Sequence, residues 1–460
     1  MNTVARLVTL AFASLGLLLA CGGDAGNEPP RGMTVRGLVQ NLHGVPVSGT
    51  AVLVSGRSPV TSGSDGRFFI PGVEAPYDIT LLLASRNTAV VYKGLTRPDP
   101  TLVFLDTGAT KTVTISGTTP PAPGKITIVF FVSGRVWGSS PVSATTGQYA
   151  MTFSSHGSAP TYTGQLYLLR AATWFPTGLP ATYDAYGSKP LTIGDEGTFS
   201  GNDFAETDLT DPPEQTIDGS VFVPAGYTIK YRALAMTFGS LHLLVASDQG
   251  TLSNPFTYAV PGVGGMTFGV YAEADEGFPN GRWSAFIRNG ITGNATDVTV
   301  PLEAATQLAL PENDAAGVDG TTPFSWSAGG GTGVNLFAVV PRDPSHPTFF
   351  VFTTGSDAKI PDLATQGMGL PATAAYWWYT NKSFPVASMD DAAGEGFLEL
   401  INWDAAEAGR TRSGVFAFTS KAVAGVALRG SAAEPTTPVL PSLQPRGWLL
   451  QPRAISTDAR

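Results

Sequence analysis

The sequence predicts an all-β protein built from tandem antiparallel β-sandwiches. Short apolar runs recur along the 460 residues and are punctuated by 54 glycines and 36 prolines, which is the pattern of strands joined by tight turns. Almost no stretch shows the 3.6-residue period of an amphipathic helix. Hydrophobic residues make up 43% of the chain, enough for packed cores, and this length suits three or four domains of about 100 residues.

Residues 33–116 are expected to form the first sandwich. An alternating strand over residues 34–39 is followed by a glycine- and proline-containing turn, and Asp65-Gly66 makes a tight hairpin that leads into an aromatic strand. This run resembles the carboxypeptidase regulatory-like domain, a transthyretin-like, Ig-like β-sandwich. The matching residues are Val35, Gly37, Val39, Gly44, Pro46, Val47, Thr61, Asp65, Gly66, Phe68, Ile70 and Val73. The resemblance implies a fold and no activity, because in carboxypeptidases this module is an accessory.

Residues 117–212 and 213–303 are expected to form the second and third sandwiches. The segment 147–153 repeats the pattern of a glycine, an aromatic residue and an alternating strand, which indicates a diverged copy of the first sandwich. Residues 216–223 restart the first strand, and residues 298–302 close the third segment as residues 101–105 close the first. The acidic, glycine-rich segment 194–211 is expected to be a surface loop and a boundary.

Residues 304–421 are expected to form the fourth sandwich. The strand around Trp326, the turn at residues 360–363 and the aromatic strand over residues 369–378 resemble those of a fibronectin type III domain. Residues 422–460 contain five scattered prolines with little periodicity, and we expect a disordered tail there.

The first twenty residues have the layout of a secretory signal, with Arg6 before an apolar run that is too short to span a bilayer. The run ends at Leu18-Leu19-Ala20-Cys21, which resembles the lipobox of bacterial lipoproteins. The resemblance implies that residues 1–20 are cleaved, that Cys21 is lipidated and that residues 21–32 form a tether. Glycine rather than aspartate after Cys21 then implies a lipid anchor in the outer membrane, facing the periplasm or the cell exterior. The alternative is an ordinary signal peptide with an incidental cysteine.

Charge and cysteine content exclude some functions. A net charge of −9 argues against a nucleic-acid partner, since a phosphate backbone requires a basic face. Cys21 is the only cysteine, so no intramolecular disulfide can form. No second apolar stretch reaches about 18 residues, so no transmembrane helix is expected.

The sequence predicts no catalytic residue, metal ligand or cofactor. The four histidines fall one per segment, without metal-ligand spacing, and no nucleophile-elbow motif occurs. Two carboxylate clusters are candidates for a glycosidase pair or a Ca²⁺ site, against the simpler interpretation of solvated loop acids. The first cluster is Glu273, Asp275 and Glu276, and the second is Asp390, Asp391 and Glu395.

Trp377, Trp378 and Tyr379 form an unusual aromatic row and are the candidate ligand-binding residues. Neighbours on a strand point to opposite faces, so at least one ring should lie off the core face. With Trp174 or Trp283 that ring would stack on a sugar, whereas ordinary sandwich packing is the alternative.

The expected function is therefore that of a non-catalytic, membrane-anchored surface lipoprotein. It would act as a scaffold, adhesion or binding protein, with the membrane as one partner and a cell-surface polysaccharide or protein as another. The first alternative is a carbohydrate-binding lipoprotein with exposed aromatic residues, and the second is a hydrolase with a carboxylate site.

Overall fold

The computed structural model describes residues 32–105, 109–156, 159–172, 179–239, 241–248, 253–277 and 281–421. Within these ranges the chain is strand and turn, apart from two short α-helices and three single 3₁₀ turns. The helical elements are η1 (Ala84–Arg86), η2 (Glu206–Asp208), η3 (Ala364–Gln366), α1 (Met389–Ala392) and α2 (Gly396–Ile401). The predicted all-β class is confirmed. The leader, Cys21 and the predicted tail lie outside the described residues.

The first sandwich contains seven strands in two sheets. They are β1 (Met33–Gln40), β2 (Ala51–Val54), β3 (Val60–Thr61), β4 (Arg67–Val73), β5 (Tyr77–Leu83), β6 (Thr88–Leu95) and β7 (Thr101–Val103). β1 pairs antiparallel with β4 and parallel with the closing strand β7. The other sheet has the order β3-β2-β5-β6.

The second and third segments repeat this seven-strand topology. The second contains β8 (Lys111–Thr118), β9 (Ile126–Ser133), β10 (Val136–Pro141), β11 (Gln148–Ser155), β12 (Thr161–Ala171), β13 (Tyr183–Gly194) and β14 (Gly197–Phe199). The third contains β15 (Glu214–Phe222), β16 (Thr228–Phe238), β17 (Leu241–Asp248), β18 (Phe256–Pro261), β19 (Phe268–Asp275), β20 (Trp283–Ile291) and β21 (Val298–Pro301). The two sheets of the second segment have the strand orders β11-β8-β14 and β10-β9-β12-β13. Those of the third have the orders β18-β15-β21 and β17-β16-β19-β20. The first three segments therefore have the same strand order.

Two details of the second segment differ from expectation. Residue 117, where this segment was expected to begin, lies inside β8. The acidic segment 194–211 contains the closing strand β14, which pairs parallel with β8. Because β14 has only three residues, Gly197–Phe199, it carries too little alternation to be recognised as a strand from sequence.

A glycine in the first strand of each repeat makes room for an aromatic ring on the fourth strand. The three cross-strand pairs are Gly37–Phe68, Gly117–Tyr149 and Gly219–Phe256. A Cβ on Gly219 would collide with the Phe256 ring and with the backbone of Val298 in the closing strand. The glycine therefore allows both the ring and the closing strand to approach the first strand closely.

The fourth sandwich contains nine strands. They are β22 (Leu308–Leu310), β23 (Ala315–Val318), β24 (Phe324–Trp326), β25 (Val334–Pro341), β26 (Thr348–Thr353), β27 (Asp357–Ala358), β28 (Ala375–Phe384), β29 (Glu407–Arg412) and β30 (Phe416–Ser420). A three-stranded sheet, β22-β24-β27, shares a core with strands β25, β26, β28 and β30. Both α-helices lie in the segment between β28 and β29, which we call the helical insertion (residues 385–406).

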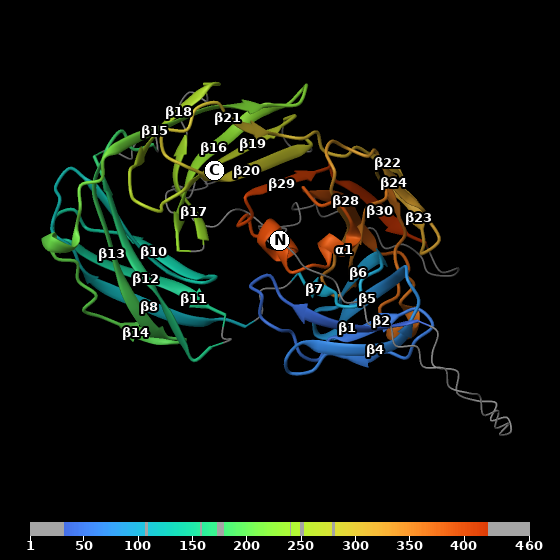
Figure 1. Ribbon diagram of the computed structural model, residues 1–460. Coiled ribbons are helices and arrows are strands. Elements are labelled where there is room, and N and C mark those ends of the chain that lie inside the picture. The colour runs from blue at the N-terminus through green and yellow to red at the C-terminus, as the bar shows by residue number, and fades with distance from the viewer. Residues whose placement is uncertain are drawn as a thin grey trace, which may run out of the picture.

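Three of the four sandwiches share one continuous 14-stranded sheet. β29 pairs with β28 of its own sandwich and with β20 of the third, and β26 pairs in parallel with β6 of the first. Figure 1 shows this sheet passing from the third sandwich through the fourth to the first. Backbone hydrogen bonds therefore connect segments that the sequence suggested were separate domains.

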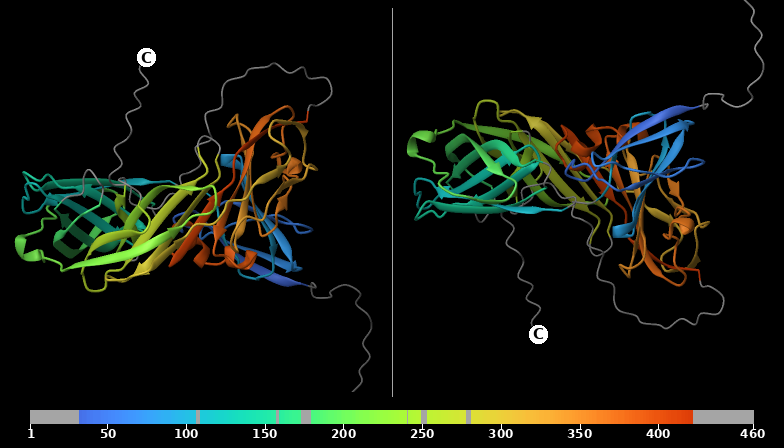
Figure 2. Two further views of the ribbon diagram at one scale, coloured as in Figure 1. Left: turned by 90° about the horizontal axis from the view of Figure 1, so that it is seen from above. Right: turned by 90° about the horizontal axis from the view of Figure 1, so that it is seen from below.

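The second sandwich attaches through side chains instead. The Phe238 ring, at the end of β16, stacks on Phe130 of β9 with ring centroids 4.6 Å apart, and Tyr167 of β12 meets the same ring edge-on at 5.2 Å. In both turned views of Figure 2 the second sandwich lies at one end of the molecule and the first and fourth lie at the other. Six consecutive residues of β9 are buried, because one face packs in its own sandwich and the other against the third.

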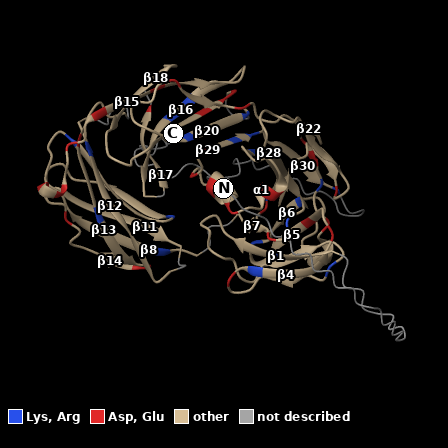
Figure 3. Ribbon diagram, in the orientation of Figure 1, with Lys and Arg blue, Asp and Glu red and all other residues tan. Residues whose placement is uncertain are grey.

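The helical insertion fills the space between the sandwiches. Met389, Phe397 and Trp403 are buried in one core together with residues of the first, third and fourth sandwiches. The buried Arg410 guanidinium lies over the Trp403 ring at 5.0 Å and donates to the Ile401 carbonyl at 3.0 Å. Most positions along the sheets are neither Lys, Arg, Asp nor Glu, as the tan ribbon in Figure 3 shows. The insertion is thus held by apolar packing together with the contacts that Arg410 makes.

Replacing Phe352 with alanine should loosen the first and fourth sandwiches together. Phe352 is 3% exposed and stacks on Tyr92 of β6 at 4.7 Å and meets Phe397 of the insertion edge-on at 5.7 Å. We expect a loss of about 3–5 kcal/mol in unfolding free energy and faster amide exchange in residues 88–95 as well as 348–353, measured by hydrogen–deuterium exchange with mass spectrometry.

Phe131→Ala is the matched control, because Phe131 is fully buried in the core of the second sandwich. Its faster exchange should stay within the second sandwich. Unchanged exchange of β6 in Phe352→Ala would show that the two sandwiches are not energetically coupled.

Candidate functional site

The aromatic row lies on β28, and its three rings have different surroundings. Trp378 is fully buried and meets Phe324 edge-on at 5.1 Å in the core of the fourth sandwich. Tyr379 is 1% exposed and points to the opposite face, into the core shared with the helical insertion. The rings alternate as expected, but neighbouring elements cover both faces at these positions. Trp378 and Tyr379 therefore have no surface on which a ligand could stack.

Trp377 is the member of the row that reaches the surface. It is partly exposed, and the Arg342 guanidinium lies 5.1 Å from the centre of its ring. Trp283, a suggested companion, is partly buried against the core that contains Tyr379, and Trp174 lies outside the described residues. Ligand binding by Trp377 stays a prediction.

The first carboxylate cluster is divided among separate protein partners. Glu273 is partly buried, accepts a hydrogen bond from the Tyr271 hydroxyl, and has its pKa raised by desolvation. Asp275 accepts from the backbone N–H of Gly277 at 2.8 Å, whereas Glu276 pairs with Arg282. Each acid thus satisfies a local structural need. Within the described part of the chain, no group of three or more histidine, cysteine or acidic side chains is arranged to hold a metal ion.

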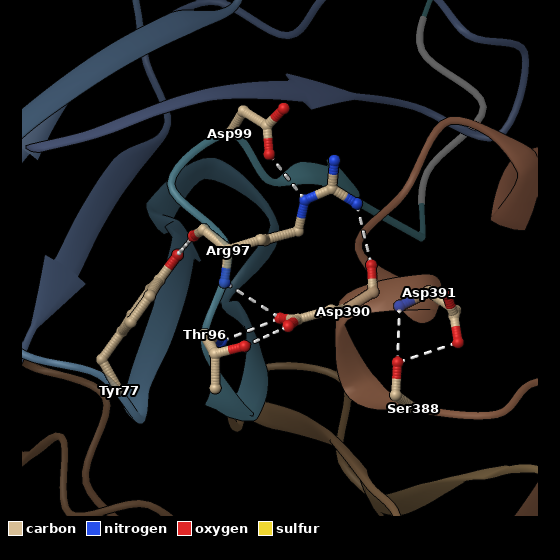
Figure 4. Close-up of polar contacts among 7 residues, drawn as sticks. All are labelled: Tyr77, Thr96, Arg97, Asp99, Ser388, Asp390 and Asp391. Carbon is tan, nitrogen blue, oxygen red and sulfur yellow. Dashed lines mark hydrogen bonds and ion pairs between the residues drawn. The ribbon is translucent and has the colours of Figure 1, made fainter. Parts of the chain in front are cut away.

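Asp390, in the second cluster, binds the first sandwich to the helical insertion. Its Oδ1 accepts from the backbone N–H of Thr96 at 2.8 Å and of Arg97 at 3.2 Å, and its Oδ2 accepts from the Thr96 hydroxyl. The Arg97 guanidinium donates to the Asp390 carbonyl at 2.9 Å and to the Asp99 carboxylate at 3.0 Å (Figure 4). We call Thr96, Arg97 and Asp390 the Asp390 latch.

The latch favours the charged form of the Asp390 carboxyl. Burial alone would raise its pKa, but hydrogen bonds from Thr96 and Arg97, together with the charge of Arg97, lower it overall. Asp391, beside it, accepts from the Ser388 hydroxyl at 2.8 Å at the start of α1. Sequence reasoning grouped these two acids, whereas the structure gives one an interdomain role and the other a local one.

The second sandwich also contacts the first sandwich and the insertion. The His43 and His156 rings stack with their centroids 3.3 Å apart. The Arg135 guanidinium pairs with Asp404 of the insertion at 3.1 Å. His242, by contrast, is mostly buried in the third sandwich, and desolvation lowers its pKa. Two of the four histidines therefore come together, a pairing that their sequence spacing did not suggest.

An open hollow of about 510 Å³ lies between β20 and the helical insertion. Its polar residues are Arg288, Glu407 and Asn289. Arg288 and Glu407 pair loosely at 3.8 Å, and the Asn289 amide donates to the carbonyls of Trp403 and Ala405. Asn289 thus ties the insertion to β20, whereas Arg288 and Glu407 join the neighbouring strands β20 and β29. The lining contains no serine, cysteine or histidine.

No helix within the described residues is long and apolar enough to cross a membrane. No protein-family model matches the chain, and no curated protein matches it.

Some solved structures show distant likeness. The Bacillus anthracis TIE protein is 8% identical with a TM-score of 0.15, and the match covers 58% of this chain and 50% of that one. A tetra-tandem repeat from the extending region of a large adhesion protein is 13% identical with a TM-score of 0.14, covering 76% and 95%. The major pilin SpaD of Corynebacterium diphtheriae is 8% identical with a TM-score of 0.15, covering 61% and 100%. The chain thus spans half the length of the TIE protein, and TM-scores this low carry no argument about function.

Asp390→Asn should weaken the latch by about 1–2 kcal/mol, because the charged acceptor of three hydrogen bonds is lost. We expect faster amide exchange at Thr96 and Arg97. Asp391→Asn makes the same charge change and should leave those two amides protected.

The latch should also depend on pH with a defined sign. Because the folded-state pKa of Asp390 is lowered, its contribution is complete above the ordinary aspartate pKa of about 4 and is lost as the pH falls through the lower folded value. Wild-type protection of Thr96 should decline below about pH 4. The Asp390→Asn variant should show no such decline, and an identical decline in both proteins would exclude Asp390 as its cause.

Replacing Trp378 and Trp377 separately should show from the loss of unfolding free energy which of the two rings belongs to the core. Trp378→Ala removes a fully buried ring and should cost about 3–5 kcal/mol. Trp377→Ala removes a partly exposed ring and should cost under about 1 kcal/mol. Denaturant unfolding followed by circular dichroism measures both, and equal costs would mean that Trp377 is part of the core.

Proposed function

We propose that this chain is a non-catalytic, lipid-anchored surface protein whose β-sandwich body is a rigid scaffold for adhesion or binding. The observation that supports this most directly is the continuous sheet. β29 and the β6–β26 pair join three sandwiches through backbone hydrogen bonds rather than flexible linkers. Such joints fix the relative orientation of the sandwiches, which suits a body that presents a surface.

The candidate catalytic groups support the same proposal. Glu273, Asp275, Glu276 and Asp390 each have a protein partner with a structural role. General acid–base catalysis requires a carboxyl or imidazole that can reach a substrate proton. Acids engaged in this way are better suited to stabilising the fold.

The finer domain assignments belong to this proposal too. We infer that the first segment is a carboxypeptidase regulatory-like module. In each of the first three segments, one sheet has the strand order fourth, first, seventh and the other has the order third, second, fifth, sixth. This recurrence supports a shared origin. We infer that the fourth is fibronectin type III-like, with β22-β24-β27 facing β30-β28-β25-β26.

The anchor would be the acylated Cys21 in the outer membrane. Several acyl chains on one residue hold a protein stably at a bilayer. The eleven residues 22–32 that separate Cys21 from β1 reach at most about 40 Å when fully extended. The first sandwich would therefore stay close to the membrane.

Cys21→Ser should release the protein from the membrane. We expect wild type to enter the detergent-rich phase of a Triton X-114 separation and the variant to stay in the aqueous phase. Mass spectrometry of the wild-type N-terminus should show cleavage before Cys21 and acyl chains on it. An unmodified cysteine, or cleavage elsewhere, would refute the anchor and leave the scaffold proposal to be judged separately.

Carbohydrate binding is the second candidate function. It is favoured by one observation, the partly exposed Trp377 on the outer face of the sheet. Loss of glycan-array binding in Trp377→Ala, with unchanged binding in a variant of a distant surface residue, is the result expected from this function.

A further inference from the structure

We propose that Arg342 and Trp377 form a binding site for acidic polysaccharide on the outer face of the sheet in the fourth sandwich, near its joint with the first at β26 and β6. This inference rests on the proposed binding role of the body and is independent of the lipid anchor. It assigns a ligand class, a carboxylate-bearing sugar chain, and gives Arg342 the role of selecting it.

The Arg342 guanidinium is exposed and is held by the indole rather than by an acid. Within the described residues it makes no ion pair, and its side chain lies over Trp377 at 5.1 Å. Asp343, the nearest acid in sequence, accepts from the backbone N–H of Ser345 at 2.9 Å, and that hydrogen bond lowers its pKa. A guanidinium oriented in this way presents several N–H donors that match a carboxylate.

The backbone positions the pair. The N–H of Arg342 donates to the Ala375 carbonyl at 2.9 Å, which ties the end of β25 to the start of β28. Two residues earlier on β25, Val340 lies directly opposite Trp377. Arg342, the first residue after β25, and Trp377 of β28 therefore lie on the same face, and the hydrogen bond to Ala375 holds the Arg342 backbone in place.

A row of partly exposed side chains continues from this pair across the joint. Trp377 and Val340 are followed by Thr348 of β26 and Thr88 of β6, in successive strands. The next row on the same face contains Phe350 and Tyr379, which are buried. The exposed row thus borders the buried core, and we call it the rim. It offers an indole, a methyl-bearing surface and two hydroxyl-bearing side chains beside one cation.

This surface suits a sugar chain better than an acidic peptide. Peptides commonly bind by adding a strand to an open sheet edge or by filling a groove. Here β6, β26, β25 and β28 each have a paired strand on both sides, so no free edge is available. A sugar can place its C–H face against the row and its hydroxyls against the threonines while its carboxylate meets Arg342.

Affinity electrophoresis of the purified full chain in detergent gives a direct test. The probes are polygalacturonate as the acidic polysaccharide, dextran as the neutral one, and poly-glutamate as the acidic peptide. Wild type should be retarded by polygalacturonate, with weaker retardation at higher salt, and should migrate freely in dextran and poly-glutamate.

Three variants separate the roles of charge and ring. Arg342→Gln should weaken polygalacturonate binding about tenfold or more, because the charge-assisted hydrogen bonds are lost. Arg342→Lys should bind at an intermediate level, since lysine keeps the charge but not the planar fork. Trp377→Ala should weaken binding as well, because the guanidinium loses its support. Lys359→Gln is the matched control, removing an exposed cation of the same sandwich, and should bind within about twofold of wild type.

Two results would overturn the proposal. Absence of polygalacturonate binding, or equal binding by wild type and Arg342→Gln, would show that the pair is not a ligand site. Equal or stronger binding to poly-glutamate would identify an acidic protein surface as the partner class instead. Circular dichroism of each variant confirms that a loss of binding does not reflect unfolding. These experiments measure polysaccharide binding by purified protein and do not depend on attachment to a membrane. A negative result therefore leaves the test of the Cys21 anchor unaffected.

Discussion

Backbone pairing between sheet edges is the interaction on which the whole architecture depends. An open edge exposes unsatisfied N–H and C=O groups, and proteins must cover or pair them. Here the edge of the first sandwich at β6 is paired with β26, and the gap between the third and fourth sandwiches is closed by β29. The same hydrogen bonds that satisfy these edges also remove the freedom of one sandwich to rotate against another.

The helical insertion makes this pairing possible. A sheet that continues through three sandwiches leaves apolar outer faces that water would otherwise meet. Phe397, Trp403 and Met389 pack against residues of the first, third and fourth sandwiches at once, and the Asp390 latch fixes the start of α1 to the loop after β6. Apolar burial drives the insertion into place, and the latch supplies a directional contact that apolar packing lacks. The exposed rim at Trp377 lies where this cover ends.

The repeat unit follows from a small set of local rules. Alternation placed most strands, and the local run of a glycine, an aromatic residue and an alternating strand at residues 66–70 and 147–153 suggested a diverged copy of the first sandwich, whose strand order the second segment shares. The structure added the cross-strand pair Gly37–Phe68, in which a glycine on the first strand makes room for a ring on the fourth. The short β14 and the two helices of the insertion were missed because elements of three, four and six residues carry too little periodicity. For the aromatic row, the sequence predicted the alternation of the rings but not which of them are buried. Strand alternation fixed which rings oppose each other, but the cover over Tyr379 comes from residues far away in the chain.

The sequence alone determined the all-β class, the approximate places of the strands and the repetition of one sandwich. These are consequences of side-chain period and turn chemistry within a few residues. Tertiary structure decided which edges pair, which sheet faces are covered, and therefore that Trp377 rather than Trp378 or Tyr379 meets solvent. It also decided that Asp390 contacts Thr96, almost three hundred residues earlier. The sequence of an edge strand does not specify its partner, because every backbone offers the same donors and acceptors. The pairing is instead selected by shape and burial over the whole chain.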